Sequence, residues 1–466
     1  MNTREFFMGI FVSTSKDNIR VTKMKKFKEG YSAFLIMCSL LLFCENKSST
    51  NNDNNGEQPN IYPTVMLEAD NQKVEDIVTR VSQDSLQAYI QKLVGFFTRH
   101  TNSDTSSTTQ GIGAARRWVF DKFRNISDRN GGKLQVYYHN FQATVRGVAG
   151  FHRNVIAELP GTLTPDRKFV VSGHLDSRNS DNDDAVGFAA GANDDGSGVA
   201  AVIELARLLS EHEFESTLLF VAFTGEDQGL FGSRAYAQDL KSNNANIVGM
   251  VTNDVIGNIV GGSGNIDSIS VRCFSDQPQD SQTSLNRQLA RYIKLQGEAY
   301  LPEFAVNLIP SRDRPGRGGD HFAFNEQGYT AARLTEPEDN LSHQHNMDDL
   351  PEFMSFPYLT KVVKINAAYL SSWADAAEMI GNVRLASPFQ GSKTLNWDPS
   401  TSTDFSNYLI AFRSPTSVAY DSLKTLDDMN EFVFKTVEFP SGVFLSISAV
   451  DKEGNESIFS AEVFVD

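Results

Sequence analysis

Cysteine is rare in this sequence. It has only three, Cys38, Cys44 and Cys273, and the first two lie in an apolar run near the N-terminus. The rest of the chain therefore has neither the cysteine pairs of a disulfide framework nor the cysteine cluster of a structural zinc site. Any metal site in the body of the protein must be built from histidine and carboxylate side chains.

Basic residues are also fewer than acidic residues. The chain carries 42 Lys and Arg against 58 Asp and Glu, which gives a net charge of −16. Nucleic-acid binding depends on clustered basic side chains that neutralise phosphates, and the body of the chain has no Lys/Arg-rich block. The composition therefore argues against a nucleic-acid partner.

Apolar runs that could span a bilayer comfortably are absent too. The run Tyr31–Phe43 is short and follows the basic segment Met24–Lys28. A charged segment followed by a short apolar run is typical of an export signal. We therefore expect residues 1–44 to direct export, with Met24 as the true start of translation.

The export segment ends in Leu41–Cys44, which resembles a bacterial lipobox, the motif whose cysteine is lipidated. Phe43 departs from the small residue usual at its position, so a plain signal peptide or a short anchor is the alternative. We predict an exported protein that is anchored to a membrane through Cys44, in the periplasm or on the cell surface, or else secreted. Residues 45–73 are predicted to be a flexible tether, because 45–60 is rich in Ser, Asn and Thr and nearly free of apolar side chains.

The middle of the chain alternates apolar strands with helices. Strands are predicted at Lys168–Gly173, Thr217–Phe223 and Ile247–Val251, and the helix Gly198–Leu209 lies between the first two. Nearly continuous apolar strands indicate a sheet that is covered on both faces. The alternation predicts an α/β fold with a doubly wound sheet. Further helices are predicted at Ser82–Phe97 and Ile112–Phe123, and further strands at Leu134–Ala143 and Asn154–Leu159.

The last part of the chain has short strands with alternating polarity, separated by turn residues, which predicts a small all-β sandwich. The strand around Trp397, together with Tyr408 and the stretch Ala449–Ser457, resembles a fibronectin type III module. We therefore predict two domains, at residues 74–381 and 382–466. No catalytic cluster occurs in the second, for which a binding or spacer role is the expectation.

Five short polar motifs carry the candidate chemistry: His174–Asp176, Asn193–Gly198, Gly225–Ser233, Asn253–Gly257 and His343–Asp349. Taken singly, they can be read as ordinary features such as a helix N-cap, an exposed acidic turn or solvated loop histidines. Three of them, however, follow apolar strands, and open α/β sheets bind ligands at the carboxyl ends of their strands. Paired carboxylates at a buried strand end are costly without a partner. Together the motifs predict a site at this edge of the sheet.

In chain order the motifs read H-x-D, N-D-x-G-S-G, G-E-D-x-G-L-x-G-S, N-D-x-I-G and a final His. This ordered set resembles the co-catalytic zinc aminopeptidase family, which includes the bacterial secreted leucyl aminopeptidases and, more distantly, glutamate carboxypeptidase and glutaminyl cyclase. The resemblance covers roughly residues 75 to 380. It implies a mixed sheet of the zinc-exopeptidase type and the hydrolysis of N-terminal residues from peptides.

The resemblance also implies two zinc ions held by five side chains: His174, Asp194, Asp227, Asp254 and His345. Asp194 would bridge the two ions. His174 and Asp254 would complete the first position, and Asp227 and His345 would complete the second. We call these the first and second metal positions throughout.

Two further residues have expected roles. Glu226 is implied to be the general base that takes a proton from a metal-activated water. Asp176 is expected to hold the far nitrogen of His174, as carboxylates beside zinc-bound histidines commonly do. Asp320 and His321 fall where the family often has a Ser-Asp-His stretch, and are expected to be structural or close to the substrate.

The sequence departs from the family pattern at two points. Asp227 replaces the usual glutamate and is shorter by one methylene, which could shift or loosen the second ion. Gln344 stands where the family often has a tyrosine that donates to the oxyanion, so that its amide or another group must donate instead. His345 is preferred to His343 as the ligand because Asp349 matches the acidic residue four positions after the ligand in the family motif.

Other functions remain open. A carboxypeptidase or glutamate-releasing enzyme would use the same metals and needs a basic pocket, which four arginines could supply: Arg312, Arg314, Arg317 and Arg333. A glutaminyl cyclase would use one zinc and no hydrolytic water. A non-enzymatic binding protein, with a decayed peptidase domain, would lack bound metal.

Overall fold

The computed structural model describes residues 12–15, 18–21, 67, 69–275, 284–314, 316–386, 392–427, 431–435 and 442–466. The chain divides into two units, Met1–Asn60 and Ile61–Asp466. In the first, β1 (Val12–Ser15) and β2 (Asn18–Val21) form an antiparallel pair. Of the predicted export segment, residues 1–44, only these two strands are described, and Cys44 and most of the predicted tether lie outside the described residues. Within the described ranges, no helix combines the length and the apolar character needed to cross a bilayer.

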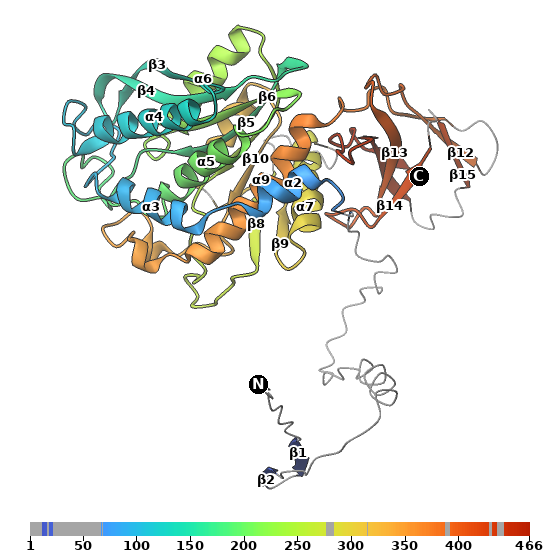
Figure 1. The fold of residues 1–466 in the computed structure, drawn as a ribbon, viewed down its shortest axis with the longest axis horizontal. Helices are drawn as coiled ribbons and strands as arrows, with labels where there is room; N and C mark the ends of the chain where they lie inside the picture. The colour runs from blue at the N-terminus through green and yellow to red at the C-terminus, as the bar shows by residue number, and fades with distance from the viewer. Residues whose placement is uncertain are drawn as a thin grey trace, which may run out of the picture. The chain divides into compact units, whose positions relative to one another are not determined.

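An eight-stranded mixed sheet forms the centre of the second unit, in the order β3-β4-β6-β5-β7-β10-β8-β9 (Figure 1). The strands β5, β6, β7 and β10 run parallel to one another, whereas β3, β4 and β8 join antiparallel to their inner neighbours. The predicted α/β class is therefore confirmed. The strands are β3 (Gln135–Val145), β4 (Val148–Leu159), β5 (Thr164–His174), β6 (Ser216–Phe223), β7 (Asn246–Asn253), β8 (Ser270–Phe274), β9 (Ala305–Ile309) and β10 (Ala331–Thr335).

Helices pack on both faces of this sheet, because successive strand residues point to opposite sides. Along β5, Phe169 and Val171 join a large core with residues of α2 to α5, α7 and α9. Val170, between them, joins a smaller core with residues of α6 and α8. The helices are α2 (Gln72–Thr79), α3 (Gln83–Val94), α4 (Gly111–Arg129), α5 (Gly196–Leu209), α6 (Phe231–Ser242), α7 (Leu285–Tyr300), α8 (His321–Glu326) and α9 (Phe356–Asp375), with two 3-10 turns, η1 (Leu341–His343) and η2 (Pro351–Phe353).

Local sequence explains where several helices begin. The side chain of Asn71 accepts hydrogen bonds from the first turn of α2, so this helix starts inside the segment predicted as tether. Ser82 caps α3 and Asp195 caps α5 in the same way. Helix α5 is apolar around nearly its whole circumference, which suits a helix buried between the sheet and other helices.

The C-terminal part consists of two antiparallel sheets, in the orders β11-β12-β15 and β14-β13-β16-β17. Trp397 and Tyr408 pack edge to face at 5.4 Å in a core to which both sheets contribute. The all-β character was predicted from the sequence, and the resemblance to fibronectin type III stays a prediction. The strands are β11 (Arg384–Ala386), β12 (Ser392–Asn396), β13 (Phe405–Arg413), β14 (Ser422–Leu426), β15 (Glu431–Lys435), β16 (Val443–Asp451) and β17 (Val463–Val465).

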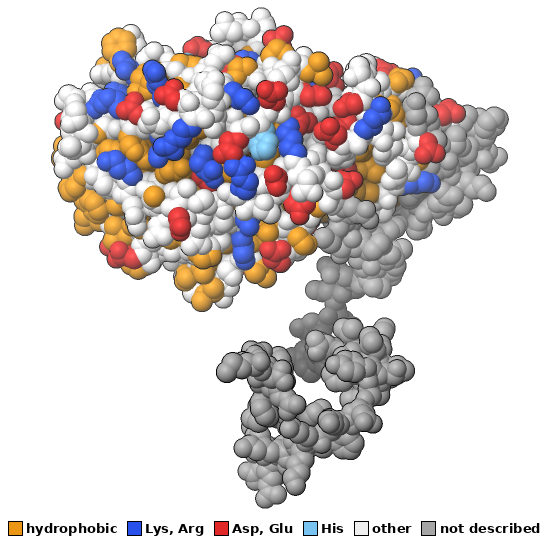
Figure 2. Space-filling model, viewed as in Figure 1, with side chains coloured by type: hydrophobic (Ala, Val, Ile, Leu, Met, Phe, Trp, Pro, Cys, Tyr) orange, Lys and Arg blue, Asp and Glu red, His pale blue; other side chains and the backbone are white. Residues whose placement is uncertain are grey.

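Buried polar contacts join the C-terminal part to α7. Arg291 pairs with Glu462 at 3.1 Å, and both side chains are almost fully buried. Gln296 donates to the buried carboxyl group of Glu456 at 3.0 Å. These contacts make the C-terminal part continuous with the α/β body. On the face drawn in Figure 2, acidic and basic side chains are interspersed.

Candidate metal centre

The candidate site lies at the carboxyl ends of the central parallel strands. His174 is the last residue of β5, and Asp254 follows the last residue of β7. Glu226 and Asp227 lie in the loop between β6 and α6, and Asp194 lies in the turn before α5. This is the edge at which open α/β sheets place their ligands.

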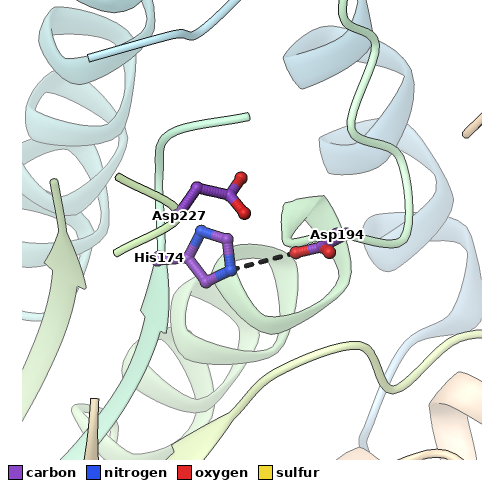
Figure 3. A group of neighbouring side chains, drawn as sticks. All are labelled: His174, Asp194 and Asp227. Carbon is purple, nitrogen blue, oxygen red and sulfur yellow. Dashed lines mark ion pairs between the residues drawn. The ribbon is translucent and has the colours of Figure 1, made fainter. Parts of the chain in front are cut away.

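Asp194 lies between the two histidines. Its Oδ1 atom is 3.0 Å from Nε2 of His174, the contact drawn in Figure 3, and its Oδ2 atom is 2.8 Å from Nε2 of His345. The main chain here is held by Asp349, whose carboxylate accepts the N–H groups of Asn193 at 2.7 Å and Asp194 at 2.9 Å. Asp194 thus presents one carboxylate oxygen to each histidine, and its role as a bridging ligand stays a prediction.

The other two predicted carboxylates complete the cluster. Oδ1 of Asp254 lies 3.8 Å from Nε2 of His174, and Oδ1 of Asp227 lies 3.2 Å from Nε2 of His345. All five predicted ligands thus meet at one edge of the sheet. His343 does not join them, because its ring stacks on Phe353 with the centroids 3.8 Å apart.

The donor atoms of this cluster fit a metal ion. Within the part of the chain that the structure describes, four of its buried atoms find no hydrogen-bond partner: Nε2 of His174, Oδ1 of Asp194, Oδ2 of Asp227 and Nε2 of His345. Buried polar atoms are rarely left unpaired, since each costs free energy. Ligand atoms of His174, Asp194 and Asp227 all lie within 4.8 Å of one another. Imidazole nitrogens and carboxylate oxygens are the ligands that zinc takes when cysteine is absent.

Opposite charges control the ionisation of the cluster. Burial alone would lower the pKa of His174, but the neighbouring carboxylates of Asp194 and Asp254 raise that pKa well above its ordinary value. Burial would also lower the pKa of His345, and the neighbouring Asp194 and Asp227 raise it to about 10. For Asp254, burial would raise the pKa, but Arg317, His174 and Arg333 together lower it.

Glu226 lies beside the cluster without being part of it. Its Oε2 atom is 3.9 Å from Nε2 of His174, and its side chain is 11% exposed. Burial, with smaller contributions from Asp254 and Asp320, raises the pKa of Glu226 well above its ordinary value. The same side chain lines a cavity of about 590 Å³ next to the cluster. A carboxyl group in this position can accept and return a proton.

Asp176 makes different contacts from those predicted. Nδ1 of His174 lies 3.1 Å from the main-chain carbonyl oxygen of Asp176, whereas the carboxylate is 3.8 Å away. That carboxylate instead accepts the N–H groups of Gly225 at 2.6 Å, Glu226 at 3.2 Å and Asp227 at 3.1 Å. Asp176 therefore orients His174 through its carbonyl group and holds the loop of Glu226 and Asp227 through its side chain.

Gln344 is not a free hydrogen-bond donor, and His321 is not one of the five clustered side chains. The Gln344 amide is buried and donates to Oδ2 of Asp194 at 3.1 Å, so it supports the bridging carboxylate. His321 begins α8 and is buried, and burial lowers its pKa to about 3. Burial raises the pKa of its neighbour Asp320 to about 7. Gln344, Asp320 and His321 therefore surround the cluster and are not among its five predicted ligands.

The adjacent carboxylates of the Asn193–Gly198 motif have separate tasks. Asp194 faces the histidines, whereas Asp195 caps α5 by accepting the N–H group of Gly198 at 2.8 Å. The Asp195 carboxylate also accepts the main-chain N–H group of His174 at 2.8 Å. The helix-cap explanation thus applies to Asp195, and the metal prediction concerns Asp194 alone.

The sequence analysis identified only some of the arginines that contact the cluster. Arg178 contacts Asp227 and His345, and the only signal in the sequence is its place just after the His174–Asp176 motif. Arg317 and Arg333 approach Asp254 at 3.4 and 3.3 Å. Five arginines line the cavity: Arg178, Arg234, Arg312, Arg314 and Arg317.

The chain matches known proteins along most of its length. The sequence profile of peptidase family M28 matches residues 154–370. A probable zinc metalloprotease of Pyrenophora tritici-repentis is 34% identical over 414 residues, which cover 82% of this chain and 85% of the relative. A second protein of that description, from Leptosphaeria maculans, is also 34% identical, over 78% of this chain and 91% of its own length.

Solved structures share the fold at low sequence identity. The LapA aminopeptidase of Legionella pneumophila has a TM-score of 0.52 and 19% identity, and the match covers 66% of this chain and 78% of LapA. The glutaminyl cyclase of Macrostomum lignano has a TM-score of 0.50 and 17% identity, and the match covers 68% of this chain and 97% of the cyclase. The two relatives compared above come from fungi, so the bacterial character of the lipobox-like motif stays a prediction. The family match and the extent of the identity to these relatives establish that the chain belongs to peptidase family M28.

Proposed function

We propose that this protein is a zinc-dependent exopeptidase that removes N-terminal residues from peptides. One observation carries the proposal: Asp194 lies between His174 and His345, at 3.0 and 2.8 Å, with buried donor atoms left unpaired around it. The names of the metalloprotease relatives and the membership of peptidase family M28 support the choice of zinc and of peptide substrates.

Two zinc ions would be held by the predicted ligands. Asp194 would bridge them, His174 and Asp254 would complete the first position, and Asp227 and His345 would complete the second. When bound, the zinc pair would lower the pKa of a shared water toward roughly 7, polarise the scissile carbonyl group and hold the free α-amine of the substrate.

Glu226 would move the proton. Its side chain lies beside the first position and opens into the cavity, where it can reach both a water and the leaving amine. The carboxylate can take a proton from water and hold it until the leaving amine needs it. Asp176 keeps Glu226 in place through the hydrogen bond to its main-chain N–H group.

The decisive experiment combines a substrate panel with one substitution. Aminoacyl-anilides should be cleaved, and a chelator should abolish their cleavage. Glu226→Gln should keep the zinc content and lower kcat/KM by about 10²–10⁴-fold, the usual contribution of general acid–base catalysis. Glu213→Gln, at a carboxylate whose side chain is 73% exposed, is the matched control and should change neither quantity. Full activity of Glu226→Gln would exclude it as the base.

A second candidate function is a peptidase that recognises a carboxylate of its substrate. The observation in its favour is the set of arginines lining the cavity, of which Arg312, Arg314 and Arg317 were singled out from the sequence. The fourth, Arg333, is buried and pairs with Asp254 and Asp313, so it would act indirectly. Guanidinium groups bind carboxylates through paired hydrogen bonds. Cleavage of N-blocked peptides only, with a preference for a C-terminal acidic residue, would favour this candidate and overturn the first.

We also propose export through residues 1–44 and anchoring at Cys44, followed by the tether 45–73. The support is the order of basic, apolar and Ser/Asn/Thr-rich segments in the sequence. Mass spectrometry of the mature N-terminus tests this proposal. A lipid on Cys44 supports the anchor, whereas cleavage at another residue without lipid would indicate secretion.

A further inference from the structure

The two metal positions differ at the far nitrogen of their histidines. A histidine that binds metal through Nε2 keeps its remaining proton on Nδ1, and that N–H group donates to an acceptor. His174 meets this requirement, because its Nδ1 lies 3.1 Å from the carbonyl oxygen of Asp176. The first position is therefore prepared for a metal ion.

His345 faces the opposite kind of group. Its Nδ1 lies 2.5 Å from Nη2 of Arg178, and a guanidinium group can only donate hydrogen bonds. In this contact Nδ1 offers its lone pair, so the guanidinium charge of Arg178 opposes the second ring proton that the carboxylates of Asp194 and Asp227 favour, and the proton on Nε2 faces those carboxylates. With a metal ion on Nε2, the Nδ1–H group would point at N–H groups of Arg178. The contact and the metal ion therefore exclude each other.

Arg178 also holds the second carboxylate of this position. Its Nε atom lies 3.1 Å from Oδ1 of Asp227, whose side chain is only 4% exposed. One guanidinium group thus engages both residues that are specific to the second position, and it places a positive charge where a second cation would bind. Arg178 lines the cavity, so this is the space into which its side chain would move on leaving the two ligands.

Arginines near the first position are arranged differently. Arg317 and Arg333 approach Asp254 at 3.4 and 3.3 Å, and neither forms a contact with His174. Arg333 is fully buried and is also tied to Asp313 and to the carbonyl group of Gly318. These arginines support one ligand of the first position and leave its histidine available.

We propose that Arg178 is an internal cation that competes with the second zinc ion for Asp227 and His345, so that the first position fills before the second. The proposal rests on the proposed zinc site and adds that its two positions are unequal. Zinc at the second position requires Arg178 to leave, and the activity of the enzyme would then depend on the free zinc concentration over the range in which the second position fills.

Zinc titration of the metal-free full-length chain tests this proposal. Calorimetry, with a competing chelator for the tight site, should give one tight zinc and a second that binds at least about tenfold more weakly. Arg178→Ala should tighten the second site by about 10-fold or more and leave the first unchanged, a magnitude usual for groups that contact metal ligands. Arg234→Ala is the matched control, because Arg234 lines the same cavity but pairs with Glu326.

A structural readout separates competition from simple loss of packing. Nitrogen-15 NMR of the histidine rings should show the Nε2 proton of His345 in the chain with one zinc, and its loss when the second zinc binds. Two equal sites in the unmodified chain would overturn the proposal, as would weaker second-site binding in Arg178→Ala. If the chain binds no zinc at all, the proposed function fails as well, and the two failures are thereby distinguished.

Discussion

The first and second metal positions share Asp194 but are built on very different parts of the fold. His174 ends a central strand, lies between two parallel neighbours and has a side chain that is 1% exposed. His345 lies in a loop between η1 and η2, has a side chain that is 22% exposed and adopts a φ of 57°. A strand fixes its ligand, whereas a loop allows its ligand to change partners. The comparison suggests a permanent position beside an adjustable one.

Asp194→Asn should abolish zinc binding at both metal positions. Without the bridging carboxylate, each histidine loses its nearest carboxylate and both positions lose a shared ligand, so both ions should be lost. Activity should then fall further than the roughly 10²–10⁴-fold expected for loss of the base. Zinc content and kcat/KM measure this effect. Asp181→Asn, in the nearby acidic loop, should match the unmodified protein, and a bridging variant that keeps two zinc ions would contradict the assignment.

Removing each histidine in turn sharpens the comparison. His174→Ala should abolish tight zinc binding, because the remaining ligands include the pair already held by Arg178. His345→Ala should leave one tight zinc and lose only the second. Zinc content after dialysis against a weak chelator measures both variants. Equal zinc loss in the two would mean that the positions depend on each other too strongly to be ranked.

A smaller effect is expected from Asp176→Asn, which keeps the carbonyl contact to His174 but disturbs the loop that carries Asp227. Three main-chain N–H groups converge on this carboxylate, and an amide can accept only part of these bonds. Activity should fall by about 10–100-fold, as for other groups that orient metal ligands, while the first zinc is retained. Unchanged kcat/KM would show that the loop holds its place without Asp176.

Glu456→Gln should have the smallest effect on zinc binding at the metal positions. It tests the stability of the folded protein instead. Burial raises the pKa of Glu456 from its ordinary 4.5 to about 8. Between these values the folded protein keeps a proton that the unfolded chain has lost, so this group makes stability decline as pH rises from about 4.5 to 8. Glu456→Gln should remove that decline and stabilise the protein at pH 8 by at least about 1 kcal/mol. Urea unfolding at pH 5 and pH 8 measures it, with the exposed Glu453→Gln as control.

Sequence reasoning found strands on one side of the sheet, from β3 to β7, but not those on the other side. The strands predicted at Lys168–Gly173, Thr217–Phe223 and Ile247–Val251 lie inside β5, β6 and β7, because buried parallel strands are apolar along their whole length. The five-residue strands β8, β9 and β10 were not predicted, since so few residues show no clear period. Their pairing, with β10 between β7 and β8, depends on contacts distant in sequence.

The candidate site was likewise predictable only in part. Residues that come directly after a buried strand, such as His174 and Asp254, can be placed from sequence, because the strand ends determine where they lie. The contacts of Arg178, Gln344 and the Asp176 carboxylate could not, because long side chains and loops choose among several partners only after folding. The motif order therefore predicted which side chains meet, and the structure was needed to see how each is oriented.

Asp349 links the adjustable position to the rigid one. Its carboxylate accepts hydrogen bonds from the main-chain N–H groups of Asn193 and Asp194. Asp349 lies in the same short loop as His345. If this loop moves away, it must either shift the turn that carries the bridging carboxylate or break the two buried hydrogen bonds that Asn193 and Asp194 donate to Asp349. We therefore expect escape of the ions and exposure of the loop to share a single rate, with amide exchange at Asn193 and Asp194 reporting both.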